Sequence, residues 1–366
     1  MARQIDSLTG VRGIAMSWVV LLHGSGYVST ESVLPESITD LIKMGWLGVD
    51  LFFLLSGFVI SYVHQTDFTQ FKANSYSRFL KLRLARIYPA HFVATMALLP
   101  VVAGATLFSI YEVTDSQYSF SRLLYSLFLL NGWGLPNSVG WNIPSWSVGS
   151  EWFAYICFPF IAYVFNRLRS PWMHVLIIIM VFTLMITLAV FIEDMKQYML
   201  GENLTLTRVT SEFLIGCSLF NIYRNVPEHK VFDFIALCSS VVMILLSATR
   251  IPPFYDFLII GTFALLILSL SRSLTFAAKL FSISPLLYLG KISYSVYLTH
   301  ATVLMIVNQI LIRLLHQNLD EVTYFWAFYL IYIACAIAVG HVLYVTVEQP
   351  ARTYLRDRWR LSAQAS

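Results

Sequence analysis

The chain has 366 residues, of which 58% are hydrophobic and only 12% are charged. Because charged residues make up about a quarter of an ordinary soluble protein, this composition excludes that class and indicates an integral membrane protein. The net charge of +4 is small, and the basic residues are dispersed among apolar segments. This pattern argues against nucleic acid as a partner and is typical of residues that set membrane topology.

The apolar segments predict an all-α polytopic membrane protein with about ten transmembrane helices in one bundle, if about 20 apolar residues make one crossing. The predicted spans are 10–28, 44–64, 88–110, 144–166, 173–193, 209–224, 231–249, 254–271, 291–313 and 324–347. The segment 120–132 is too short to span and is predicted to be an interfacial or re-entrant piece. With no internal repeat or linker, we expect a single membrane domain over 1–366, with a short basic tail from about residue 348.

The distribution of basic residues predicts the orientation of these spans. If the N-terminus is cytoplasmic, 18 Lys and Arg residues fall on the cytoplasmic side and 6 on the opposite side. This asymmetry predicts that both termini are cytoplasmic in a multi-pass plasma-membrane protein, the inner membrane if the host is bacterial. The first apolar run lacks a small-residue cleavage pattern, so we expect no cleavable signal peptide. The four cysteines lack metal-type spacing, and we expect them to be buried apolar residues with no metal site.

Ionisable residues within membrane spans are costly and indicate function. His23, Asp50 and Glu151 lie about five to seven residues from the outer ends of their predicted helices, and therefore about 8–10 Å below the outer surface. A histidine and a carboxylate that meet in a low dielectric form a general-base arrangement, because the carboxylate stabilises the imidazolium. The pattern predicts catalytic roles for all three residues. The alternative is that each one only satisfies a hydrogen bond between helices.

The segment LTGVRGIAMSWVVLLH places Arg12 and His23 eleven residues apart. On a helix this spacing is three turns plus about 20°, so the two residues share one face about 16 Å apart along the axis. Such a face suits a long ligand with an anionic head at the cytoplasmic mouth and a reactive end inside, since an arginine fork binds phosphate. The alternative for Arg12 is a positive-inside anchor.

The segment SYSRFLKLRLARIYP crowds four basic residues ahead of Pro89, which is predicted to open the third helix. One interpretation is a phosphate cradle, in which Arg83 and Arg86 lie beside Arg12. The alternative is topological anchoring, or attraction to anionic membrane lipids.

Two further segments supply candidate substrate-binding residues. In NIPSWSVGSEWFAY, a proline and a glycine permit an irregular helix entry of the kind that lines a cavity, and Trp146 and Ser150 lie there. Trp146 either stacks on a sugar face or belongs to the interfacial aromatic belt. In LGKISYSVYLTH, Tyr297 and His300 are one helical turn apart, and the alternative for both is hydrogen bonding between helices.

Taken together, these motifs resemble the acyltransferase-3 family of integral membrane O-acyltransferases. LTGVRGIAMSWVVLLH is similar to the Arg-x10-His signature of that family, GVDLFFLLSGFVIS to its second-helix motif, and RLARIYP to its Arg-x-x-Arg motif. The segments PSWSVGSEWFAY, RVTSEFLIGCSLF, LGKISYSVYLTH and VEQPARTYLR match further parts in the expected order. The resemblance covers nearly the whole chain, and it is to a stand-alone member without a hydrolase-like extension.

The resemblance implies a ten-helix bundle that takes an acyl group, usually acetyl, from cytoplasmic acyl-CoA. The acceptor would be a hydroxyl of a carbohydrate, a lipid-linked glycan or another cell-surface polysaccharide precursor. Acyl-CoA is then a donor substrate, and no tightly bound cofactor is expected. The resemblance implies that Arg12, Arg83 and Arg86 hold the CoA phosphates, and that Glu151 is important. His23 would act either as a general base or as the carrier of the acyl group.

The competing interpretation is a proton-coupled transporter or flippase of a glycan or small metabolite, which buried acids and histidines would also suit. Such a protein is expected to show paired broken helices in two related halves. The sequence has one irregular helix and no related halves, which favours the enzyme.

Overall fold

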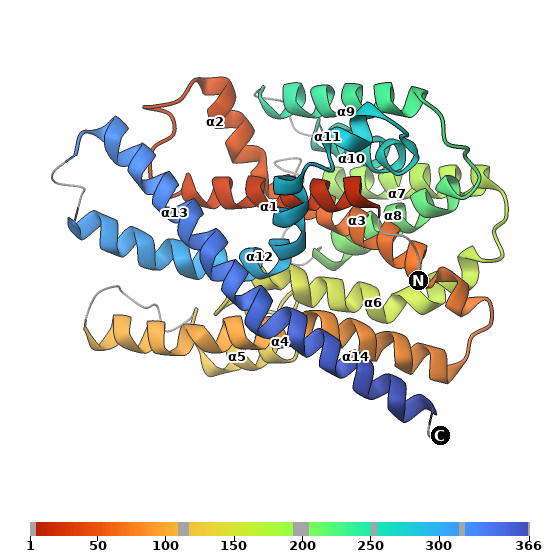
Figure 1. The fold of residues 1–366 in the computed structure, drawn as a ribbon, viewed down its shortest axis with the longest axis horizontal. Helices are drawn as coiled ribbons and strands as arrows, with labels where there is room; N and C mark the ends of the chain where they lie inside the picture. Colours follow the sequence, from red (N-terminus) through yellow and green to blue (C-terminus); the bar gives the residue numbers. More distant parts are fainter. Residues whose placement is uncertain (1–4, 109–116, 193–204, 250–254, 315–318, 365–366) are drawn as a thin grey trace. The chain divides into compact units, whose positions relative to one another are not determined.

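A computed structural model describes residues 5–108, 117–192, 205–249, 255–314 and 319–364, and the regular secondary structure within these ranges is helical (Figure 1). The α-helices are α1 (Asp6–Gly24), α2 (Glu36–Lys43), α3 (Leu47–His64), α4 (Ala73–Leu107), α5 (Phe120–Leu127), α6 (Trp146–Phe165), α7 (Pro171–Ile192), α8 (Thr205–Tyr223), α9 (Val231–Ser247), α10 (Tyr255–Arg272), α11 (Phe276–Leu280), α12 (Ser284–Leu314), α13 (Glu321–Leu343) and α14 (Gln349–Gln364). The predicted all-α class is confirmed.

Six helical segments of the described residues are long and apolar enough to cross a membrane, and the protein is a multi-pass membrane protein. They are Glu36–Phe68, Ala73–Leu107, Ile143–Phe165, Pro171–Phe191, Ser284–Leu314 and Glu321–Trp359. Each of the ten predicted spans does contain a helix, but α1, α8, α9 and α10 are not among these six. Helices α1 and α8 carry polar side chains along their 19 residues, and α9 has only 17. The count of ten crossings stays a prediction.

The predicted start of the third helix, at Tyr88 and Pro89, was wrong. Helix α4 begins at Ala73 and runs for 35 residues to Leu107, with Pro89 and Pro100 inside it. The basic segment before Pro89 is therefore helical and does not form a loop. A proline removes one backbone donor from a helix, but helices in membranes tolerate this loss because neighbouring groups satisfy the freed carbonyl.

Two other local predictions agree with the structure. A 3-10 turn, Ile143–Ser145, precedes α6 and forms the irregular entry expected there. The segment predicted to be too short for a span contains the eight-residue helix α5. Its position relative to the membrane stays a prediction.

The chain divides into two compact units, and each is made of three separate stretches of sequence. The first unit comprises Met1–Leu22, Leu34–Ser75 and Ile156–Lys291, and the second comprises His23–Val33, Tyr76–Tyr155 and Ile292–Ser366.

In the first unit, helices α3 and α8 pack so closely that their backbones touch. A Cβ atom at Gly57 would lie 2.0 Å from the Phe213 carbonyl oxygen, and one at Gly216 would lie 2.1 Å from the Leu54 carbonyl oxygen. Small residues allow this approach, and dispersion contacts between the backbones then hold the helices together where lipid supplies no hydrophobic driving force.

In the second unit, the segment 128–145 is tied down by buried side-chain hydrogen bonds. Asn131 Nδ2 donates to Ser145 Oγ at 2.7 Å, and Asn142 Nδ2 donates to the Leu298 carbonyl of α12 at 2.9 Å. These bonds set the entry of α6 against the part of α12 that carries the predicted substrate-binding residues.

Candidate active site

His23 meets a second histidine at the end of α1. Its ring centroid lies 4.8 Å from that of His300 on α12, with the rings at 73° in an edge-to-face contact. His23 is half-buried, whereas His300 is fully buried. His23 was predicted to be catalytic and His300 to bind substrate. Both residues belong to the second unit, in which their rings are in contact.

The hydrogen bonding of His300 leaves one of its ring nitrogens as an acceptor. Nδ1 lies 2.6 Å from the Tyr297 carbonyl oxygen, which can only accept, so Nδ1 carries the proton. Nε2 of the neutral ring then presents a lone pair. This atom is buried and, among the described residues, has no hydrogen-bond partner. A buried acceptor without a donor is costly, which marks this position as one where a donor such as a hydroxyl can bind.

A serine that the sequence analysis did not single out links α6 to α12. Ser147 Oγ donates to Tyr297 Oη at 2.9 Å, and the Tyr297 ring lies 5.6 Å from that of His300. The predicted Ser150 is engaged differently, since its hydroxyl donates to the Gly132 carbonyl at 2.8 Å. The sequence signal for Ser147 was its place one helical turn before Glu151, in a segment already selected for its irregular helix entry.

Glu151 lies on the same helix as Ser147 and accepts a hydrogen bond from a tyrosine. Tyr155 Oη donates to Glu151 Oε1 at 2.5 Å, and Arg83 interacts electrostatically with both residues. The rings of Phe79 and Tyr155 also touch, with centroids 6.4 Å apart. The helical basic segment of α4 thus runs beside α6 at the level of Glu151.

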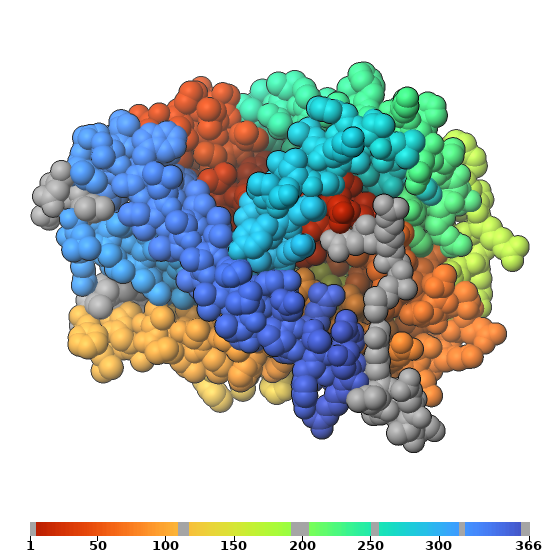
Figure 2. All heavy atoms as spheres, viewed as in Figure 1, coloured from red at the N-terminus to blue at the C-terminus, as the bar shows by residue number. Residues whose placement is uncertain are grey.

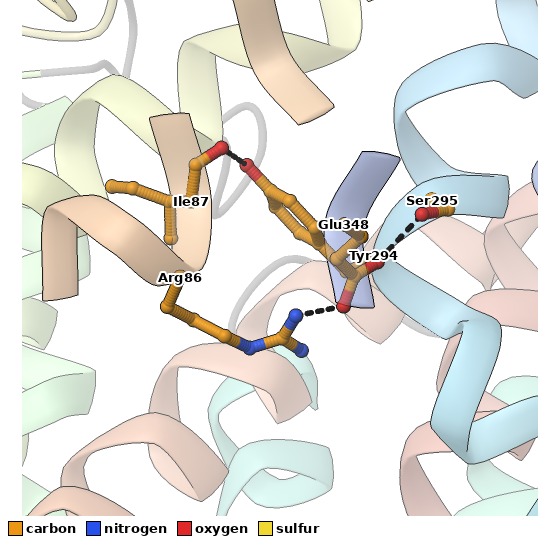
Figure 3. A network of polar contacts seen from close by, with 5 residues as sticks. All are labelled: Arg86, Ile87, Tyr294, Ser295 and Glu348. Carbon is orange, nitrogen blue, oxygen red and sulfur yellow. Dashed lines mark hydrogen bonds and ion pairs between the residues drawn. The ribbon is translucent and has the colours of Figure 1, made fainter. Parts of the chain in front are cut away.

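Arg86, the second arginine of the pair, belongs to a buried polar network (Figure 3). Its guanidinium forms an ion pair with Glu348 and lies over the Tyr294 ring, 5.3 Å from the centroid. Ser295 Oγ donates to the other carboxylate oxygen of Glu348 at 2.5 Å, and Tyr294 Oη donates to the Ile87 carbonyl at 2.7 Å. Sequence reasoning missed Glu348. Its signal was a lone glutamate directly after the last predicted span.

Asp50 lies in the first unit, where Arg208 holds both of its carboxylate oxygens. The Nε–Oδ1 and Nη2–Oδ2 distances are 2.7 and 2.6 Å, and Asp50 is fully buried. Glu212 lies 3.6 Å from the same guanidinium. A bidentate pair of this kind compensates the Asp50 charge and braces α3 against α8.

Two further predicted residues are half-buried, namely Arg12 on α1 and Trp146 at the start of α6. Within the described part of the chain, no three His, Cys, Asp or Glu side chains gather as metal ligands would.

Fold and site together define a multi-pass helical membrane protein with a histidine pair and buried arginine–carboxylate contacts. A sequence model described as the acyltransferase domain of the acyltransferase-3 family matches residues 5–345. The chain belongs to this family, which confirms the resemblance seen in its motifs.

Several curated proteins are similar to this chain. The acyltransferase MdmB of Streptomyces mycarofaciens is 31% identical over 43% of this chain and 38% of its own length. The peptidoglycan O-acetyltransferase OatA of Listeria monocytogenes is 23% identical over 84% of this chain and 51% of its own length. The putative peptidoglycan O-acetyltransferase YrhL of Bacillus subtilis is 24% identical over 96% of this chain and 55% of its own length. The chain thus spans about half the length of the curated relatives it matches. No solved structure matches it.

Proposed function

We propose that this protein is a membrane O-acyltransferase that moves an acyl group, acetyl in the first instance, from cytoplasmic acyl-CoA to a hydroxyl of a carbohydrate. The acceptor class is a peptidoglycan or related cell-surface polysaccharide precursor, since two of the relatives carry peptidoglycan O-acetyltransferase in their names. The observation that carries the proposal is the contact of His23 with His300, whose buried Nε2 has no hydrogen-bond partner among the described residues.

The chemistry requires one group that takes a proton and returns it. In the general-base form, His23 accepts the proton of the acceptor hydroxyl while the hydroxyl oxygen attacks the thioester carbonyl. The carbon–sulfur bond then breaks. The imidazolium gives its proton to the CoA sulfur, which leaves as the free thiol. In the covalent form, a ring nitrogen of His23 attacks the thioester carbonyl and the CoA thiolate leaves. The acceptor hydroxyl then attacks the acyl-imidazole carbon, the carbon–nitrogen bond breaks, and the hydroxyl proton passes to the thiolate. Both forms place the acceptor at the histidine pair, where His300 Nε2 can accept a hydrogen bond from a neighbouring hydroxyl of the carbohydrate.

The remaining predicted residues divide between the two ends of this site. Arg83 and Arg86 are assigned to the phosphates of CoA, because arginine suits phosphate geometry. The phosphate-binding role of Arg12 stays the prediction made from the sequence. Trp146 and Tyr297 are assigned to the acceptor.

The carboxylates receive separate roles in this proposal. Glu151 is assigned to the electrostatic support of the imidazolium. Ser150 supports the shape of the α6 entry through its backbone hydrogen bond. Asp50 is assigned to bracing, because both of its oxygens are held by Arg208.

Release of free CoA thiol by the purified full-length protein tests the proposal. The assay contains acetyl-CoA with or without a soluble peptidoglycan fragment, and mass spectrometry of the fragment seeks one added acetyl group. We expect thiol release that depends on the acceptor and a matching acetylated product. A folded protein that releases no thiol with any glycan acceptor would overturn the proposal and favour the transporter.

A further inference from the structure

The junction of α13 and α14 turns one acidic residue inward. A π-helical turn, Tyr344–Glu348, joins the two helices, and such turns are rare and frequent at functional sites. Glu348 is 2% exposed, although Gln349 and Pro350, which follow it, are exposed. A π-helical turn holds more residues than an α-helical one, so it rotates the side chains that follow. This rotation directs the Glu348 carboxylate inward.

The Glu348 carboxylate is fully paired within the second unit. Its Oε1 contacts Arg86 on α4, and its Oε2 accepts a hydrogen bond from Ser295 on α12 (Figure 3). A buried charge in a membrane protein is tolerated when a counter-charge and hydrogen bonds replace its hydration. Arg86, whose side chain is 16% exposed, supplies that counter-charge.

The same contacts define the orientation of the Arg86 guanidinium. Glu348 binds one of its nitrogens, and the Tyr294 ring lies below its face. An arginine can hold a carboxylate through one nitrogen and address a second anion through others, because its donors form a rigid fork. A guanidinium that is already held in place loses less side-chain freedom when an anion arrives.

We propose that Glu348 is a positioning residue that holds Arg86 in the orientation in which it meets the anionic end of the acyl donor. The inference rests on the proposed function, in which Arg86 binds the phosphates of acyl-CoA. It also explains how the buried positive charge of an anion site is compensated in a membrane protein when no donor is bound. Arg86 pairs with Glu348, so its charge stays compensated when the donor leaves.

The variant Glu348→Gln tests the proposal, because glutamine keeps the shape and the contact to Ser295 but loses the charge. On detergent-solubilised full-length protein, we expect the Kd for acetyl-CoA from calorimetry and the donor KM to rise about tenfold, as for one lost charge-assisted hydrogen bond. The kcat and the acceptor KM should stay unchanged. A fall in kcat with an unchanged donor Kd and KM would overturn the proposal.

The matched control is Asp357→Asn, which also converts an acid to an amide near the C-terminus. Asp357 lies on α14, which is visible on the surface in Figure 2. Its side chain is 54% exposed and pairs with Arg356. We expect Asp357→Asn to leave the donor Kd and all kinetic constants unchanged. An effect equal to that of Glu348→Gln would show a general charge effect and would overturn the positioning role.

A double-mutant cycle with Arg86→Ala separates positioning from general structural support. If Glu348 acts through Arg86, then Glu348→Gln causes no further weakening of donor binding in the Arg86→Ala background. Additive losses would contradict the proposal. If Glu348→Gln is not monodisperse in size-exclusion chromatography, Ser295→Ala takes its place, because it removes the hydrogen bond to the carboxylate without changing charge. We expect a smaller rise of the donor KM in that variant, and no rise would overturn the proposal.

The wild-type protein separates failure of this inference from failure of the proposed function. If the wild type neither binds acetyl-CoA nor releases its thiol, the proposed function fails. If the wild type does both and Glu348→Gln binds acetyl-CoA equally well, only the role of Glu348 is rejected.

Discussion

His23 combines three properties at the scale of single residues. It lies one position before the end of α1, it is half-buried, and its ring packs on the edge of His300. His300 is itself oriented by the Tyr297 carbonyl, so one ring of the pair has a defined tautomer. This arrangement suits a group that must take and return a proton.

We predict that His23→Ala lowers kcat with acetyl-CoA by about 10²–10⁴-fold, the usual contribution of a positioned base, and by more if His23 carries the acyl group. The measurement is acceptor-dependent thiol release by protein that is monodisperse and present at normal abundance in membranes. Near-normal turnover in a well-folded His23→Ala protein would remove the proposed mechanism.

Asp50 differs from His23 because its charge is already compensated. We predict that Asp50→Asn lowers the free energy of unfolding by about 3–5 kcal/mol, since it leaves Arg208 buried without its bidentate partner. The folded fraction should keep its kcat. The measurement is the thermal unfolding midpoint in detergent, together with turnover per folded protein.

The control for Asp50 is Asp67→Asn. Asp67 follows the same helix and pairs with His64, but its side chain is 53% exposed, so its loss should leave the midpoint nearly unchanged. Normal stability with lost turnover in Asp50→Asn would give Asp50 the catalytic role that its predicted depth first indicated.

At the scale of helices, packing in the first unit depends on small residues. Helices α3 and α8 meet at Gly57 and Gly216, where there is no room for a Cβ atom on either helix. The bidentate pair of Asp50 and Arg208 joins the same two helices. Close backbone approach and a buried ion pair thus act on one interface.

We predict that Gly57→Ala destabilises the protein by about 1–3 kcal/mol, because the added methyl group would lie 2.0 Å from a carbonyl oxygen and force the helices apart. The measurement is the thermal unfolding midpoint. Gly261→Ala on α10 is the matched control, since a Cβ atom there has nothing within 4 Å and alanine favours a helix. Equal midpoints for the two variants would contradict the packing argument.

The helices also show how far local patterns reach. Apolar length predicted a helix in each of the ten segments, because hydrophobicity over about 20 residues is a property of the segment itself. The start of α4 was predicted wrongly because helices usually begin or end near a proline, and Pro89 suggests such a boundary. In α4 the helix continues through it, and this brings Arg83 into electrostatic interaction with Tyr155 and Glu151.

At the scale of the whole molecule, the distribution of Lys and Arg predicts the orientation in the membrane. We predict that both termini are cytoplasmic. A Ser366→Cys variant, in a background without the four native cysteines, should resist a membrane-impermeant maleimide on intact cells and react after permeabilisation.

The control is Ser37→Cys, at an exposed position between the first two predicted spans, which should react on intact cells. Ready labelling of Ser366→Cys on intact cells would reverse the orientation, and with it the assignment of acyl-CoA to the basic residues of α4.

The sequence by itself determined the helical membrane class, the family and most of the polar residues of the candidate site. These depend on composition, on segment length and on ordered motifs, which are local properties of the chain. His23, Glu151, Arg83 and Arg86 were all identified in this way.

Only the tertiary structure decided which of these residues meet. His23 contacts His300, Arg86 pairs with Glu348, and Asp50 pairs with Arg208. The partners are separated by more than 150 positions in each case, so no helical periodicity relates them. The pairing of buried charges depends on which faces of the packed helices are in contact. Those faces are set by all the contacts within each unit together.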